Sequence, residues 1–318
     1  MKRSWLVRAA AAIASVAVAG AVVSTSSATA RQPRRDDPAT VAFAATTRST
    51  SWTQVQKIAL RFPTYHPQGL ALVGDRIFLS TVEILEAPVR YPAPVDGYDR
   101  TPGRGVGHVL VLDRQGTLLK DVTLGEGTVY HPGGIDFDGT SVWVPVAEYR
   151  PNSRAIVYRL DPRTYRAAEA FRVNDHVGGV VRDRETGIVH GVSWGSRTLY
   201  AWSANGRQLT RQANEDHMLD YQDCDYAGAG KQICGGVTGL ATATGGSYEL
   251  GGIALRDLSD NAILHEIPFP KFSSAGHVVT RNPIALERTG STLRMFTAPD
   301  DGEEVAGTEL IVFESPVA

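Results

Sequence analysis

A short motif recurs along the chain, each time at the start of a run of apolar residues. It reads His-Pro-Gln-Gly-Leu-Ala-Leu-Val-Gly from His66 and His-Pro-Gly-Gly-Ile-Asp-Phe-Asp-Gly from His131. A third copy starts at His176, and weaker copies start at Asp220 and Asn282. Further short runs rich in Val, Ile and aromatic residues follow each copy, which is typical of β-strands. Four such strands per copy predict the blades of a β-propeller.

The number of copies predicts the number of blades. The last copy has room for only three strands before the chain ends, whereas residues 52–60 form an additional strand ahead of the first copy. Pairing these two segments would close the ring and cover both exposed sheet edges. We therefore predict an all-β, five-bladed propeller over residues 52–318, closed by an N-terminal strand. A six-bladed ring is the alternative, because the longer intervals have room for another blade.

The N-terminus has the features of a secretory signal. Basic residues at positions 2 and 3 precede an apolar run over 9–23, which leads into Ala28-Thr29-Ala30. This order predicts a signal peptide over residues 1–30 and a secreted, extracellular protein. The alternative is a membrane anchor, but the run is rich in Ala and short for a span of roughly 20 residues. The polar residues 31–51 are predicted to be a flexible leader.

Charge narrows the range of partners. Removing the signal takes away Lys2, Arg3 and Arg8 and lowers the formal net charge from −2 to −5. A mildly acidic protein without clustered Lys and Arg is poorly suited to nucleic acid. We expect a monomer without a membrane span after processing, whose partner is a small-molecule ligand or an extracellular glycan or protein.

Cys224 and Cys234 are the two cysteines of the chain. An even count in an oxidising compartment predicts a disulfide bond between them. Gly228 and Gly230 lie between the two cysteines and predict a turn that places them on neighbouring strands. A pair of metal-bound thiolates is the alternative, which the lack of a nearby histidine cluster disfavours.

The repeated corners point to a candidate site. In a propeller, the loops that precede the first strand of each blade lie on one rim, so we expect His66, His131, His176, Asp220 and Asn282 to form a ring. Imidazole and carboxylate groups that converge on a cavity are suitable ligands for a divalent cation, Ca²⁺ or Zn²⁺. Alternatively, each histidine is structural and forms a hydrogen bond with a neighbouring loop.

The loops after the second strands should lie on the same rim. They contribute Glu83 and Glu148, which are candidate catalytic bases, and Trp194, a candidate ligand contact. Asp300 and Asp301 are expected at the same place in a later blade. An insertion over residues 84–107 leaves the first blade at this place and is rich in Pro and Tyr. Long loops of this kind often bind ligands, and a solvated loop is the alternative. Its candidate ligand contacts are Tyr91, Tyr98 and Arg104.

The His-Pro-x-Gly repeats, the signal and the Asn282-Pro corner resemble an uncharacterised family of secreted bacterial β-propeller proteins, a domain of unknown function, over the whole mature chain. At the level of the fold, the chain is similar to calcium-dependent gluconolactonase and strictosidine-synthase-like propellers. That similarity implies a Ca²⁺ ion held by Glu, Asn and Asp, parts for which Glu83 or Glu148, Asn282 and Asp220 are candidates. The histidine ring departs from that pattern.

These patterns predict a secreted propeller that binds a small molecule at a face lined by His and Glu. If the protein is an enzyme, we expect a metal-dependent hydrolase with lactonase-like or esterase-like activity. The alternative is a non-catalytic extracellular recognition module for a protein or glycan.

Overall fold

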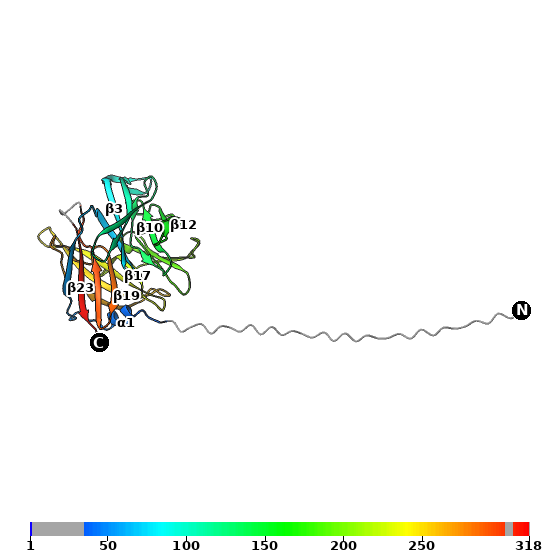
Figure 1. The fold of residues 1–318 in the computed structure, drawn as a ribbon. Coiled ribbons are helices and arrows are strands. Elements are labelled where there is room, and N and C mark those ends of the chain that lie inside the picture. Colours follow the sequence, from blue (N-terminus) through cyan, green and yellow to red (C-terminus); the bar gives the residue numbers. More distant parts are fainter. Residues whose placement is uncertain (2–34, 303–307, 318) are drawn as a thin grey trace. The chain divides into compact units, whose positions relative to one another are not determined.

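The computed structural model describes Met1, residues 35–302 and residues 308–317. Apart from Met1, the predicted signal peptide therefore lies outside the described residues. Within them, the strands form five blade sheets arranged in a ring (Figure 1). The all-β, five-bladed propeller is confirmed, and the six-bladed alternative is wrong. No helix among the described residues is long and apolar enough to cross a membrane.

Each blade runs outward from an inner to an outer strand. Blade 1 contains β2 (His66–Val73), β3 (Arg76–Glu86), β6 (Arg104–Asp113) and β7 (Leu118–Leu124). Blade 2 contains the two short inner strands β8 (His131–Pro132) and β9 (Asp136–Phe137), then β10 (Val142–Ala147), β11 (Ala155–Leu160) and β12 (Ala167–Val173). Blade 3 contains β13 (Gly179–Arg182), β14 (Val189–Val192), β15 (Thr198–Trp202) and β16 (Gln208–Ala213), with a 3-10 turn, η1 (Trp194–Ser196), between its second and third strands. Blade 4 contains β17 (Asp220–Tyr226), β18 (Lys231–Ala241), β19 (Ser247–Asp257) and β20 (Ile263–Pro268).

Blade 5 joins the two ends of the chain. Its strands β21 (Ile284–Thr289), β22 (Thr292–Thr297) and β23 (Glu309–Pro316) come from the C-terminal part, and β1 (Thr53–Ala59) comes from the N-terminal part. The outer strand β1 pairs antiparallel with β23, from Thr53 opposite Glu314 to Ala59 opposite Glu309. The predicted closure by an N-terminal strand is confirmed.

Residues 35–51 differ from the predicted flexible leader. They include a helix, α1 (Pro38–Ala44), whose Phe43 is fully buried in a cluster with Phe269 of blade 4 and Met295 of blade 5. The hydroxyl of Thr40 donates a hydrogen bond to the carbonyl of Ala227 at 2.7 Å. The prediction of a leader is wrong for this part of the chain, because a few apolar side chains in a polar segment are enough to anchor it.

Two buried aspartates connect the inner strands at the axis. Asp223 of β17 accepts hydrogen bonds from the backbone N–H groups of Leu70 (2.8 Å) and Ile135 (3.0 Å), in blades 1 and 2. Asp136 of β9 accepts hydrogen bonds from the backbone N–H groups of Arg182 in β13 (3.0 Å) and of Tyr226 in β17 (3.1 Å). Carboxylates therefore satisfy backbone donors that a curved inner strand leaves unpaired.

The disulfide bond is confirmed. Cys224 of β17 lies directly opposite Cys234 of β18, and the two sulfur atoms are bonded. The turn between these strands has Gly228 and Gly230 at positive φ, as a tight reversal requires.

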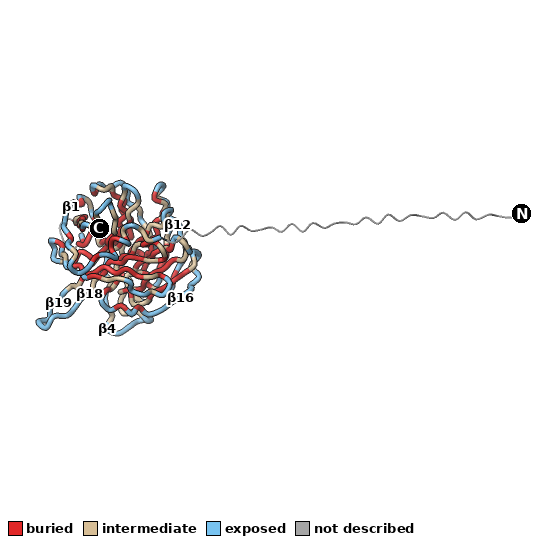
Figure 2. Tube along the Cα trace, turned by 90° about the horizontal axis from the view of Figure 1, so that it is seen from below, coloured by how far each residue is buried: buried red, intermediate tan, exposed pale blue. Residues whose placement is uncertain are grey.

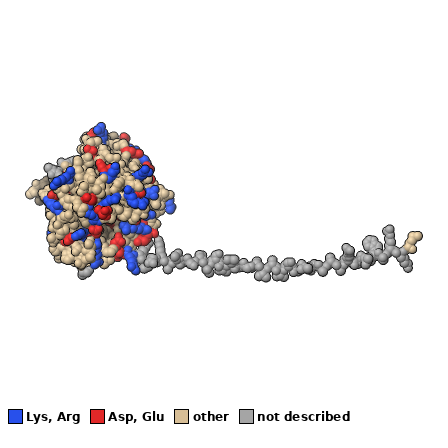
Figure 3. Space-filling view, viewed as in Figure 1, with Lys and Arg blue, Asp and Glu red and all other residues tan. Residues whose placement is uncertain are grey.

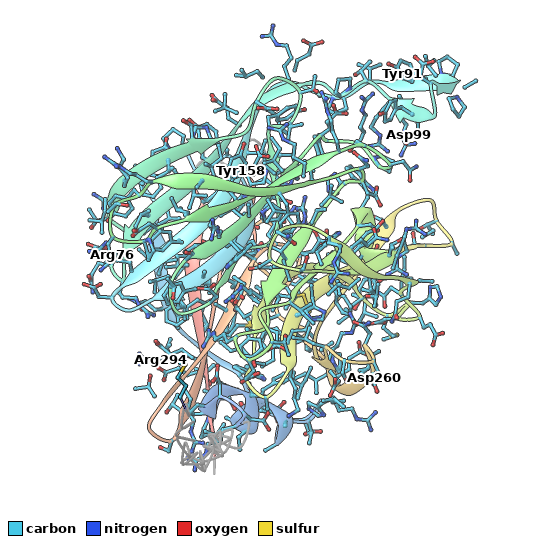
Figure 4. The ribbon with its side chains drawn as sticks, turned by 90° about the vertical axis from the view of Figure 1, so that its right-hand side faces the viewer. Arg76, Tyr91, Asp99, Tyr158, Asp260 and Arg294 are labelled. Atoms are coloured by element: carbon cyan, nitrogen blue, oxygen red, sulfur yellow. A yellow bond between two sulfur atoms is a disulfide. The ribbon has the colours of Figure 1, made fainter. Side chains whose placement is uncertain are left out.

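Two hairpins extend beyond their blades. The insertion in blade 1 carries β4 (Arg90–Val95) and β5 (Tyr98–Arg100), and the β18–β19 hairpin of blade 4 projects with an exposed end (Figure 2). Both hairpins lie on the right-hand side of Figure 4, where Tyr91 and Asp99 mark the insertion and the other hairpin is yellow. In the face that Figure 3 draws, basic and acidic side chains are interspersed.

Candidate functional site

The structure brings the three histidines of the repeat together on one rim. His66 begins β2, His131 begins β8, and His176 lies shortly before β13. The ring centroids of His66 and His131 are 6.2 Å apart, and those of His131 and His176 are 6.0 Å apart. The spacing of the motif therefore places corresponding corners of three neighbouring blades side by side.

These histidines line a cavity of about 280 Å³. Gln68, Tyr149, Trp194, Asp220 and Gln222 also contribute to its wall. Of the predicted contacts, Trp194 and Asp220 thus join the histidines, whereas Asn282 does not line the cavity. This volume is close to the lower end of the usual range for small-molecule sites, roughly 300 to 1,000 Å³.

His131 lies in the middle of the group and is 5% exposed. Both of its ring nitrogens are buried without a hydrogen-bond partner among the described residues. Its ring stacks on that of Tyr149, with 4.2 Å between the centroids. Burial, and then the neighbouring His176 and His66, hold the pKa of His131 well below its ordinary value, so the imidazole is neutral at pH 7.

His176 is held from outside the cavity. Its Nδ1 is 2.8 Å from the backbone carbonyl oxygen of Glu148. Burial lowers its pKa to about 4. A neutral imidazole that donates its Nδ1 proton to this carbonyl has its lone pair on Nε2.

His66 has a charged partner that the repeat did not reveal. Its Nδ1 lies 3.3 Å from Oδ2 of Asp301. That carboxylate is fixed by the guanidinium of Arg281 at 3.1 Å and by the side-chain amide of Asn282 at 2.9 Å. Asn282, a predicted metal ligand, therefore donates its N–H to Asp301 and orients His66 indirectly.

The two predicted catalytic glutamates lie outside the cavity wall. Glu148 is 2% exposed, with Oε1 bound to Thr128 and Arg154 and Oε2 bound to Arg150. Burial alone would raise the pKa of Glu148, but these hydrogen bonds and the charge of Arg150 outweigh it and lower the pKa. Glu83 lies in β3, 3.8 Å from Nε2 of His108.

The insertion reaches the rim through Arg100, which was not predicted, and Tyr98, which was. The guanidinium of Arg100 lies 5.0 Å from the ring centroid of Trp194, over the edge of the cavity. Tyr98, which was predicted, stacks under the guanidinium of Arg150 at 3.5 Å. Tyr91 is half-buried within the hairpin, and Arg104 is mostly exposed and lies 3.7 Å from Glu86.

The donor set implied by the calcium-dependent propellers does not converge here. Asp220 forms an ion pair with Arg197 at 2.7 Å, although burial raises the pKa of its carboxyl. Glu148 is neutralised by arginines, and Asn282 presents its amide N–H to Asp301. Among the described residues, no group of three His, Cys, Asp or Glu is arranged to hold a metal ion.

Three residues of the site, Tyr149, Arg150 and Arg100, were not predicted from the sequence. Tyr149 and Arg150 follow β10 directly, so a search of the residues after each second strand would have found them. Asp301, which follows the second strand of blade 5, was expected on this rim, but its pairing with His66 was not predicted. Arg100 lies inside the irregular insertion, and nothing in the repeat predicts its contact with Trp194.

Comparison with known proteins gives a family and distant folds. A profile of the "Family of unknown function (DUF6454)" matches residues 42–315. A search of curated proteins found no match. Similar solved structures include hydrazine synthase from Kuenenia stuttgartiensis, with 11% identity, a TM-score of 0.38, and coverage of 78% of this chain and 60% of that chain. The chain therefore spans less than two thirds of that relative.

Two further structures are similar along most of their length. Catalytically inactive virginiamycin B lyase from Staphylococcus aureus has 12% identity and a TM-score of 0.42, over 84% of this chain and 100% of that chain. A luciferin-regenerating enzyme has 9% identity and a TM-score of 0.46, over 85% of this chain and 97% of that chain. At these identities the likeness concerns the fold and says nothing about an activity of this chain.

Proposed function

The chain belongs to the family of unknown function DUF6454. For this member of the family, we propose that the histidine cavity binds a small polar molecule and hydrolyses an ester or lactone bond in it. The observation that carries this proposal is the pairing of His66 with Asp301 at the wall of a cavity that also contains the neutral His131. A histidine oriented by a carboxylate is a common general base.

The order of contacts suggests a division of roles. Asp301, held by Arg281 and Asn282, would accept a hydrogen bond from Nδ1–H of His66. Nε2 of His66 is then free to accept a proton from water. The water oxygen would form a bond to the carbonyl carbon as its proton moves to Nε2. The C–O bond of the ester would then break, and the protonated His66 would return the proton to the leaving alkoxide.

The neutral imidazole of His131 would stabilise the negative charge that develops on the carbonyl oxygen. A neutral imidazole with a lowered pKa can donate a hydrogen bond to such an oxygen without carrying a charge in the resting site. Neither nitrogen of His131 has a hydrogen-bond partner among the described residues, and both are buried. Its N–H would reach the ligand once the ligand displaces the side chains that cover it. Tyr149 and Trp194 would contact the rest of the ligand.

The test uses purified protein with p-nitrophenyl acetate and δ-valerolactone as substrates. We expect saturable hydrolysis of at least one of them, and His66→Gln should lower kcat/KM by about 100-fold or more. His265→Gln is the matched control, because this histidine lies on the outer strand β20, away from the cavity, and should leave kcat/KM unchanged. Hydrolysis no faster than the blank, or unaffected by His66→Gln, would overturn the proposal.

A divalent cation is the second candidate, although the three histidines would have to move to bind it, because no such group among the described residues is arranged to hold a metal ion. The observation that favours it is that Nδ1 of both His66 and His176 faces an oxygen atom, an arrangement found around metal-bound histidines. Elemental analysis of the purified protein, together with its His131→Ala variant, decides between the two. A stoichiometric ion that the variant lacks would support the cation, and hydrolysis that is unchanged after treatment with a chelator would count against it.

We also propose that the protein is secreted and that its substrate is extracellular. The signal-like N-terminus and the buried disulfide bond both favour an oxidising compartment. Export is tested by N-terminal sequencing of protein recovered from the medium, which should begin at residue 31.

A further inference from the structure

The second strand of blade 4 is longer than its inner neighbour. β17 begins at Asp220, which pairs with Val237 of β18, whereas β18 continues to Ala241. Within the described part of the chain, residues 238–241 pair only with β19, from Thr238 opposite Leu250 to Ala241 opposite Ser247. Because the strand order β17-β18-β19-β20 runs outward, the unpaired edge of residues 238–241 faces the axis of the ring.

This free edge lacks two of the usual protections against pairing, charged side chains and proline. Residues 238–248 include no charged residue and no proline, the residue types with which exposed edges are commonly protected. Two of their apolar side chains are well exposed, Leu240 at 46% and Tyr248 at 50%. An unprotected edge on an otherwise well-paired molecule is a template for another extended strand.

The edge also lies beside the cavity. Asp220, where β17 begins, contributes to the cavity wall. A strand that pairs with residues 238–241, beyond the start of β17, would therefore end at the mouth of the cavity. Blade 1 repeats the arrangement, because β3 continues to Glu86 beyond the last pair of His66 with Val82. The exposed Leu85 lies on this second overhang. The insertion and the β18–β19 hairpin project on the same side in Figure 4.

We propose that the edge formed by residues 238–241 binds an extended polypeptide segment, which adds a strand to blade 4 and directs one of its ends towards the histidine cavity. The absence of charge in this edge selects a peptide without a run of like charges, in which apolar and polar residues alternate. Because the edge faces the axis, we expect it to pair with a single strand at the usual interstrand spacing of about 4.8 Å. The hairpins on the rim would obstruct a folded partner.

Peptide docking at this edge does not depend on hydrolysis in the cavity, and each can fail without the other. The probe is a library of random decapeptides, selected for binding to the full mature chain. A second selection uses a variant in which an Asn-Gly turn replaces residues 240–248, which leaves the pair of Gly239 with Glu249 intact. We expect the full chain to enrich alternating peptides at least tenfold over the shortened variant.

Amide hydrogen exchange then locates the bound peptide. An enriched peptide should slow exchange in residues 238–241, and methylation of its alternate backbone nitrogens should abolish binding. Leu240→Lys should weaken binding by about tenfold, whereas Leu264→Lys on the outer strand β20, where the side chain is 48% exposed, should not. The proposal would be overturned by equal enrichment on both proteins or by slowed amide exchange outside residues 238–241. It would also be overturned if light scattering showed that two copies of the protein pair through this edge instead.

Discussion

Glu148 shows at the level of one residue why a carboxylate on the correct rim need not be catalytic. Both of its oxygens are engaged, one by Arg150 and the other by Thr128 and Arg154, and its backbone carbonyl fixes His176. Removing one partner of a buried ion pair leaves the other charge uncompensated. The carboxylate therefore stabilises the loop that positions the imidazole.

Glu148→Ala should consequently lower the free energy of unfolding by about 3 kcal/mol, as loss of a buried pair does. Urea denaturation measures this change. Glu83→Ala is the control, because that side chain is 35% exposed and its closest charged partner is 3.8 Å away, so we expect a loss below about 1 kcal/mol. A fully stable Glu148→Ala protein without hydrolytic activity would instead indicate the catalytic role predicted from sequence.

Asp136 at the axis makes a prediction about pH. Burial raises its pKa to about 6, against an ordinary value of 3.8, although two backbone N–H groups oppose the shift. The folded protein then binds more protons than the unfolded chain between about pH 4 and pH 6, so this group's contribution to stability is lost as pH rises through that range. His131 and His176, whose pKa values are lowered, act in the opposite direction below pH 6.5.

Comparison of the wild type with Asp136→Asn separates the aspartate from these histidines, and the difference includes the effect of its charge on the buried Asp223 and Asp225, whose pKa values that charge raises. The wild type should gain roughly 3 kcal/mol relative to the variant when the pH falls from 7 to 4, because two units of pKa correspond to about that free energy. Urea unfolding at several pH values gives the two curves. Parallel curves would show that the carboxylate keeps an ordinary pKa within the fold.

At the scale of elements, the sequence predicts what the repeat determines. Corresponding corners had to meet on one rim, which brings His66, His131 and His176 together. The contacts of a corner with the neighbouring blade have no period, so the partnership of His66 with Asp301 and the engagement of Glu148 by arginines were not predictable in this way. The helix α1 was missed for a similar reason, since its packing depends on apolar side chains of blades 4 and 5.

The packing of α1 can be measured directly. Phe43 is fully buried, so Phe43→Ala should lower the free energy of unfolding by about 3 to 5 kcal/mol through the lost apolar contacts and the cavity that remains. Val41 belongs to the same helix and is 54% exposed, so Val41→Ala is the matched control with an expected change within about 0.5 kcal/mol. Equal, small losses in both variants would mean that the helix detaches in solution.

At the scale of the whole molecule, the ring depends on a strand contributed from near the other end of the chain. β1 provides the outer strand of blade 5 and covers the edge of β23, while α1 packs beneath blades 4 and 5. A propeller without this strand would expose both an unpaired edge and apolar surface. The folded unit therefore extends from about residue 35, earlier than the boundary at residue 52 that the sequence predicts.

Two truncations test where the folded unit begins. A chain that starts at residue 35 should unfold at the same urea concentration as the chain that starts at residue 31, because it retains α1 and β1. A chain that starts at residue 61 should aggregate or unfold at a much lower concentration, because β23 then has a free edge. Adding a synthetic peptide of residues 35–60 should restore the native transition, since the missing segment binds as one helix and one strand. If the chain from residue 61 is as stable as the others, closure by β1 does not hold the ring together.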